Sequence, residues 1–277
     1  MQSILQSKVF VKGRAVVQYE KLVPRGEIAM PFLLLPLTVF VIAFFYASVG
    51  FGGATGYLAV MSLFDLPPKL MASTALVLNL VVSSVAFLNY YSAGHFRFRL
   101  LWPFLVTSIP AAFMGGYLRL HDQVYFMLLY GVLTFVMGRM LFFSRPGDDL
   151  ASRRALSPLV GMGVGAVIGL LSGMVGIGGG IFLSPLILLM RWGTSKEASA
   201  VASVFIFINS ASGLVGRVLG GNFLLNSLGL TLLPAGILAA FGGAYLGARK
   251  FSGVTMRRLL GLVLLVAISK YFYGEFF

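Results

Sequence analysis

Two glycine-rich stretches, GFGGATG at residues 50–56 and GIGGG at residues 176–180, interrupt long apolar runs of this chain. Each leads into an apolar run that is too short to cross a bilayer comfortably, at 53–64 and at 180–190. Backbone that is not helical is tolerated at membrane depth only where protein covers it or where it lines a water-filled cavity. Two such interruptions at corresponding places in two halves indicate the binding site of a transporter.

The composition places the chain in a membrane. Of its 277 residues, 58% are hydrophobic and only 10% are charged, whereas soluble domains carry about 25% charged residues. The chain has no cysteine, which excludes disulfides, thiol nucleophiles and cysteine-bound metals. Acidic residues flank the apolar runs, which weighs against an intramembrane enzyme and against a proton pump with a buried carboxylate. We expect a multi-pass membrane protein that is not an enzyme and has no cofactor and no metal site.

A basic arm precedes ten apolar elements. The arm, residues 1–30, is either an interfacial segment or an extension ahead of a start at Met30. We expect a first membrane repeat at 31–143, a cytoplasmic connector at 144–154 and a second membrane repeat at 155–277, all of it α-helical. Each repeat holds five elements, one of them half-length. The apolar runs are 31–49, 53–64, 70–94, 100–118, 123–138, 155–175, 180–190, 198–216, 223–248 and 259–269.

The two halves align at an offset that drifts only from 126 to 128 residues. Repetition on this scale indicates internal duplication, with chance glycine matches as the alternative. Because each half has an odd number of crossings, the repeats are expected to be inverted relative to each other. The aligned pairs include Gly50–Gly176, Gly52–Gly178, Gly53–Gly179, Lys69–Lys196, Ser83–Ser210, Gly94–Gly221, Phe113–Phe241 and Gly115–Gly243.

The net charge of +13 comes from basic residues in short connectors. This distribution is the positive-inside pattern of membrane proteins, and no basic domain is present that could bind nucleic acid. Twelve of the sixteen basic residues beyond residue 30 fall on one side, which is therefore expected to be cytoplasmic. The five basic residues of the arm narrow that difference to twelve against nine.

The half-length helices supply the candidate binding site. Each would begin with unpaired backbone amides and the positive end of its dipole, which together favour an anion. Amide and hydroxyl side chains in 70–94 and 198–216 can donate to the same ligand. The alternatives are close packing through small residues and hydrogen bonds between helices. Arg217, at the end of its run, either collects anions at the mouth of the site or anchors the span at the interface. The candidate substrate-binding residues are Gly52, Gly53, Thr55, Asn79, Ser83, Gly178, Gly179, Gly180, Ser203, Asn209 and Ser210.

At these residues the chain resembles the sulfite exporter TauE/SafE family of membrane permeases. The resemblance rests on ASVGFGGATG and SGMVGIGGGIFLSPLILL, and on the following segments LPPKLMASTALVLN…SAGHF and GTSKEASAVASVFIFINS…GGNF. It covers nearly everything from Met30 to the C-terminus, although Ala54 and Thr55 stand where the family more typically has further glycines. It implies a plasma-membrane permease that exports small sulfur-containing anions such as sulfite or organosulfonates, or that carries another small organic anion.

The sequence thus predicts a transporter that alternates access to an anion site at the membrane midplane. Its expected partners are a small anionic substrate and the lipid bilayer, with a coupling ion and a second copy of the chain as further candidates. Two alternatives belong to other classes. One is a selective anion channel whose site stays continuously open, and the other is a membrane subunit or sensor that transports nothing.

Overall fold

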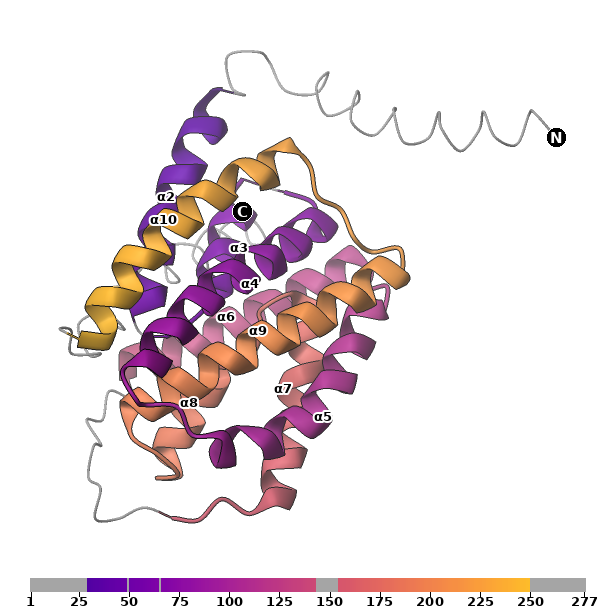
Figure 1. Ribbon diagram of the computed structural model, residues 1–277. Coiled ribbons are helices and arrows are strands. Elements are labelled where there is room, and N and C mark those ends of the chain that lie inside the picture. Colours follow the sequence, from indigo (N-terminus) through magenta and orange to yellow (C-terminus); the bar gives the residue numbers. More distant parts are fainter. Residues whose placement is uncertain (1–28, 49, 65, 143–153, 250–277) are drawn as a thin grey trace.

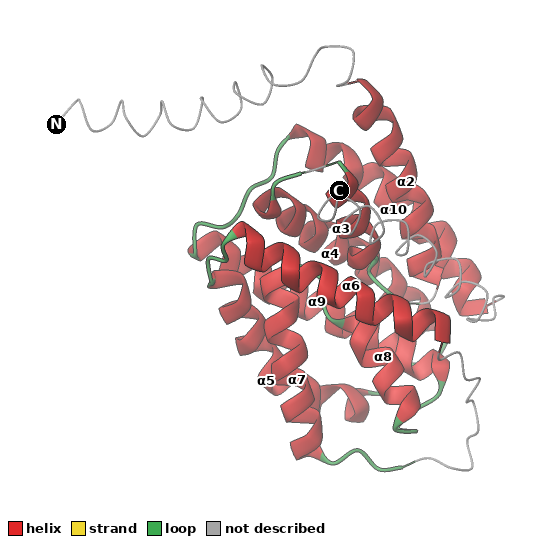
Figure 2. Ribbon diagram, turned by 180° about the vertical axis from the view of Figure 1, so that it is seen from behind, coloured by secondary structure: helices red, strands yellow, loops and turns green. Residues whose placement is uncertain are grey.

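Nine α-helices and no strands make up the part of the chain that the computed structural model describes, which is residues 29–48, 50–64, 66–142 and 154–249 (Figures 1 and 2). Nine of the ten predicted apolar runs correspond to these helices, and the all-α prediction is confirmed. The run at 259–269, the arm up to residue 28 and nearly all of the connector lie outside the described residues. The helices are α2 (Ala29–Ser48), α3 (Ala54–Leu63), α4 (Pro68–Ser92), α5 (Phe98–Tyr117), α6 (Asp122–Phe142), α7 (Pro158–Val175), α8 (Gly180–Leu189), α9 (Ser195–Leu219) and α10 (Ser227–Arg249).

Helices α3 and α8 are the two half-length elements. Each has 10 residues and is therefore about 15 Å long, half the thickness of a bilayer's hydrocarbon core. The residues that precede them, Gly53 and Gly179, have φ angles of +93° and +82°. Only glycine adopts this left-handed conformation without a steric penalty. The glycine clusters therefore set where each short helix begins and in which direction it leaves.

The second break turns the chain back towards the membrane face from which it came. The amide of Arg154, just before α7, donates to the carbonyl of Arg191, just after α8, at 2.9 Å. The two ends of this broken pair of helices therefore lie side by side. Both breaks begin with the same type of backbone hydrogen bond, in which an amide donates to the carbonyl five residues earlier. The donor and acceptor are Phe51 and Tyr46 in the first half, and Ile177 and Ser172 in the second.

The helices of the two sequence halves interleave in space. α5 packs mainly on α7 and α9, α10 packs mainly on α2 and α4, and α4 packs on α9 in the centre. Figure 1 shows α2 beside α10 on one side, α5 beside α7 on the other, and α4 and α9 between them. The helices thus form two packed groups: α5 of the first half packs with helices of the second half, and α10 of the second half packs with helices of the first half. The repeat boundaries and the inverted relation of the repeats stay predictions.

Small residues bring the backbones of neighbouring helices into contact. Glycines four residues apart on α7 face α5 so closely that a Cβ atom on any of them would meet an α5 carbonyl group. Such small-residue stripes allow helices to approach closely in membranes, where no hydrophobic effect drives them together. The same packing joins α10 to α2. The facing pairs are Gly165–Phe104, Gly169–Ser108 and Gly173–Ala112 for α7 and α5, and Gly243–Phe44 and Gly247–Ser48 for α10 and α2.

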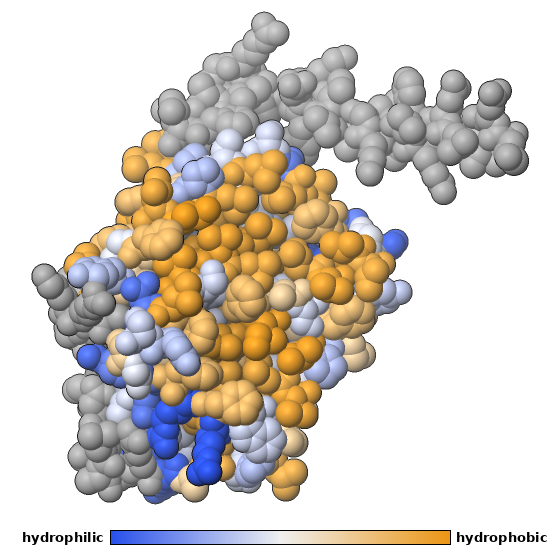
Figure 3. Space-filling model, in the orientation of Figure 1, coloured by the Kyte–Doolittle hydropathy of each residue, from blue (hydrophilic) through white to orange (hydrophobic). Residues whose placement is uncertain are grey.

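The outer surface suits a lipid environment. In Figure 3, apolar side chains cover most of the described surface, and hydrophilic side chains gather towards the lower edge of the view. Five of the described helices are long and apolar enough to cross a membrane, namely α4, α5, α7, α9 and α10 from Ser227 to Gly247. The protein is therefore a multi-pass membrane protein.

The α5–α7 contact can be tested with one substitution at two positions. Gly169→Ala will destabilise the protein by about 1–3 kcal/mol, because the added Cβ meets the α5 backbone at Ser108, which cannot swing aside. Gly163→Ala, on the same helix, is the control, since nothing lies within 4 Å of its Cβ. It should change stability by less than about 1 kcal/mol and in the stabilising direction. Thermal unfolding in detergent measures both, and equal effects would contradict this packing.

Candidate anion site between the two glycine breaks

The two glycine breaks meet at the centre of the molecule. A Cβ atom on Gly52 would contact the side chains of Asn79 and Ile206, and a Cβ atom on Gly178 would contact both of these and Ser210. Asn79 and Ile206 are each the twelfth of 25 residues in their helices, α4 and α9. Both breaks therefore lie halfway along helices that are long enough to cross the bilayer.

Asn79 connects the first half of the chain to the second break. Its Nδ2 atom donates to the carbonyl of Ile177 at 3.1 Å and to Ser210 Oγ at 3.4 Å. The side chain is completely buried, and its Oδ1 atom, which faces Gly52, has no donor among the described residues. An unpaired amide oxygen at this depth is costly. It can accept a hydrogen bond from a protonated ligand, while Ser210 keeps its hydroxyl hydrogen for an acceptor.

The backbone adds donors at the same place. Within the described residues, the amides of Gly52, Gly53, Gly178, Gly179 and Gly180 donate to no backbone carbonyl, and all five residues are buried. These amides lie at the N-terminal ends of α3 and α8. The first amides of a helix have no partner within the helix, and the N-terminal end of the helix dipole is positive. Such a pair of helix ends suits the oxygens of an anion.

Thr55 uses its side chain locally, in a hydrogen bond of 2.8 Å with the hydroxyl of Tyr46. Gly53 and Gly179 offer only their backbone amides, because a Cβ atom on either would meet apolar or aromatic side chains instead of the central cluster. Three more predicted site residues donate to carbonyls of their own helix, although the Oδ1 atom of Asn209 is buried without a partner among the described residues. These are Ser83, Ser203 and Asn209. The central cluster thus contains Gly52, Asn79, Gly178, Gly180 and Ser210 from the predicted set, with Gly180 joined to it through Ile206.

Ile206 is the central residue that polarity alone did not reveal. It packs against Gly52, Gly178 and Gly180, and it occupies the place in α9 that Asn79 occupies in α4. The offset of 127 that pairs Ser83 with Ser210 also pairs Asn79 with Ile206. An apolar residue gives no chemical signal of a site, so only that alignment could have pointed to it.

Arg217, predicted at the mouth of the site or at the interface, lies in the last turn of α9 with its side chain buried. Its side chain is 5% exposed. The Nη2 atom donates to the carbonyls of Gly173 and Met174 at 3.1 and 2.6 Å. Position near the end of an apolar run indicated an interfacial residue, but α7 packs against α9 and its C-terminal turn covers the guanidinium.

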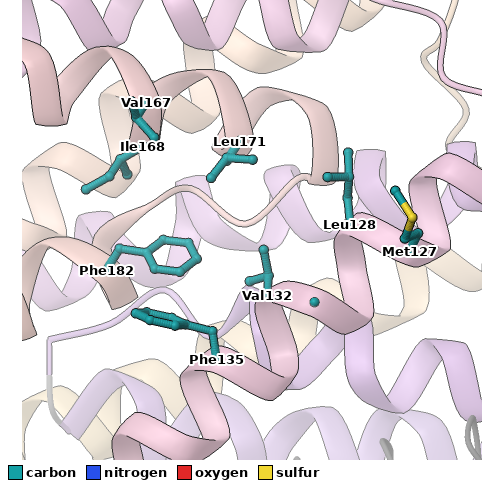
Figure 4. A pocket seen from close by; sticks show the side chains of 9 residues that line it. Met127, Leu128, Val132, Phe135, Val167, Ile168, Leu171 and Phe182 are labelled. Carbon is teal, nitrogen blue, oxygen red and sulfur yellow. The ribbon is translucent and has the colours of Figure 1, made fainter.

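A hollow of about 420 Å³ lies beside the second break. Side chains of α6, α7 and α8 line it, and Figure 4 shows that they are all apolar, with Phe135 and Phe182 facing each other. Ile168 lines this hollow and also packs against Gly179. Because its lining is almost entirely apolar, this hollow offers few hydrogen-bond donors to an anion. The described residues also contain no group of three metal-ligating side chains.

Comparison with known proteins identifies the family of the chain. A sequence profile described as sulfite exporter TauE/SafE matches residues 35–271. The chain belongs to the sulfite exporter TauE/SafE family. No solved structure gives a significant match to it.

Relatives of this TauE/SafE protein are named as probable transporters. The probable membrane transporter protein y4hK of Sinorhizobium fredii is 35% identical over 237 residues, which is 84% of this chain and 95% of the relative. The probable membrane transporter protein YunE of Bacillus subtilis is 26% identical, over 77% of this chain and 84% of the relative. The probable membrane transporter protein MJ0441 of Methanocaldococcus jannaschii is 24% identical, over 66% and 72%. Family and fold together make this chain a membrane transporter.

The contact between Gly52 and Asn79 can be tested by a double-mutant cycle. Gly52→Ala should destabilise the protein by about 1–3 kcal/mol, because its Cβ meets the buried Asn79 amide. In an Asn79→Ala background the same change should cost less, with a coupling energy of about 0.5–3 kcal/mol. Gly53→Ala is the control, since its Cβ would meet Tyr57 and its cost should be the same in both backgrounds. Chemical unfolding in detergent measures each variant. Additive costs for Gly52 and Asn79 would rule out the central cluster.

Proposed function

We propose that this protein moves small sulfur-containing anions, such as sulfite or organosulfonates, across the plasma membrane by alternating access. The observation that carries the proposal is the meeting of the two glycine breaks at mid-depth, where unpaired amides from both halves lie around Asn79 and Ser210. Helix ends bind anions by partial charges and N–H groups, and need no fixed cation in contact with the ligand. The family supports sulfur oxyanions as the substrate class.

The closed packing at the breaks favours a transporter over a channel. Asn79, Ile206 and Ser210 fill the space between Gly52 and Gly178. In the proposed cycle a ligand reaches the amides when α4 and α9 move apart, as in a mechanism where one group of helices rocks against the other around a central site. A continuously open pore would need a wet passage at this level. The proposed direction of transport is export of the anion, driven by the membrane potential or by a coupling ion.

Two other functions are compatible with the same candidate site, and measurements of current and flux distinguish them from the proposed one. A selective anion channel would give single-channel currents and no stimulation by substrate on the opposite side. A permease for another organic anion would show saturable flux of a carboxylate and none of sulfite, sulfonate or thiosulfate. Homo-oligomer formation and contact with lipid are compatible with all three functions.

Transport by the purified protein in liposomes tests the proposal directly. We expect saturable flux of sulfite, methanesulfonate or thiosulfate that rises when the same anion is present on the other side. Ser210→Ala should raise KM about threefold to tenfold, because it removes one hydroxyl donor to the anion. Ser212→Ala is the matched control, since its hydroxyl donates to Ile109 of α5, away from the breaks, and KM should not change. Absence of flux for every sulfur anion would overturn the proposal.

A further inference from the structure

Arg217 carries a buried positive charge that no carboxylate neutralises among the described residues. Its only hydrogen bonds there run from Nη2 to the carbonyls of Gly173 and Met174, and its Nε atom is buried without a partner. The next carbonyl along, that of Val175, accepts from Tyr125 at 3.1 Å. Two side chains thus hold the last turn of α7, immediately before the second glycine break. Charged side chains at membrane depth are rare and costly, and they commonly mark a functional site.

In the first half of the chain, a neutral side chain makes the corresponding hydrogen bond to the last turn of the helix before the glycine break. The hydroxyl of Tyr90, on α4, donates to the carbonyl of Ser48 at the end of α2 at 3.1 Å. Tyr90 and Arg217 are 127 residues apart, and Ser48 and Met174 are 126 apart, which are the offsets that align the two halves. The two positions are therefore equivalent. Holding the helix end needs only a hydrogen-bond donor, so the charge on Arg217 exceeds what that task requires.

The surplus charge lies close to the second break. The carbonyl end of α7 offsets roughly half a unit of charge at most, which leaves a net positive potential. Ser210, beside Gly178, and Arg217 lie seven residues apart on the same face of α9, which is about 10 Å along the helix. The charge is buried, so salt screens it little, and the surrounding protein weakens it far less than water would.

We propose that Arg217 is a specificity-determining residue that makes the second glycine break the stronger anion-binding half of the site, while Tyr90 holds the first break without adding charge. This rests on the proposed anion site. Arg217 acts at a distance through its charge and does not touch the anion. Its effect therefore grows with the charge of the ligand, whereas a purely structural role would weaken all ligands alike.

Thermal shift of the purified full-length protein with methanesulfonate, a monoanion, and thiosulfate, a dianion, tests this. Arg217→Tyr copies the residue of the first half and keeps a donor. It should raise Kd about tenfold for methanesulfonate and about a hundredfold for thiosulfate, because the electrostatic free energy scales with ligand charge. Arg217→Lys keeps the charge and should stay within about threefold for both. Arg119→Gln is the matched control, because it removes an exposed charge near the same end of α9 and should change Kd by about twofold or less.

The outcomes separate the two proposals. If the wild-type protein responds to both anions and Arg217→Tyr weakens them equally, or not at all, the charge proposal is overturned while the anion site stands. If Arg217→Lys is as damaging as Arg217→Tyr, the guanidinium geometry matters and the charge proposal is again overturned. If the wild-type protein responds to no anion, both proposals fall.

Discussion

Every backbone amide in a bilayer's hydrocarbon core must find a partner in the protein, in a ligand or in trapped water. This protein has two places where a helix stops at mid-depth, and at both the first amides of the next helix lack a backbone acceptor. The rest of the described architecture covers these two places. α4 and α9 cross directly over them, and the other helices pack around that pair.

Burial of the breaks depends on backbones that come unusually close. Glycines on α7 and α10 let α5 and α2 approach until carbonyl groups lie where side chains would otherwise stand. Because α5 packs with helices of the second half of the chain and α10 with helices of the first, each packed group of helices draws on both halves. Interleaving ties the two groups of helices together, with α4 and α9 in contact between them.

Equivalent positions in the two halves share a geometry and differ in chemistry. Asn79 and Ile206 occupy the same place between the breaks, one a polar amide and the other a branched alkyl group. Tyr90 and Arg217 hold the same helix end, one neutral and the other charged. The two helix ends are similar, and these differences make the centre between them asymmetric.

The sequence by itself determined the helical membrane class, the two glycine breaks and the half-length helices, because each follows from local composition and from the missing Cβ of glycine. It also indicated polar residues such as Asn79 and Ser210, which stand out within apolar runs. Only the tertiary structure decided which of them meet. Hydroxyls of Ser83 and Ser203 are satisfied by their own helices, apolar Ile206 lies at the centre, and Arg217 lies beneath α7. The physical reason is that burial and hydrogen-bond partners are set by contacts between helices more than a hundred residues apart, and no local pattern records them.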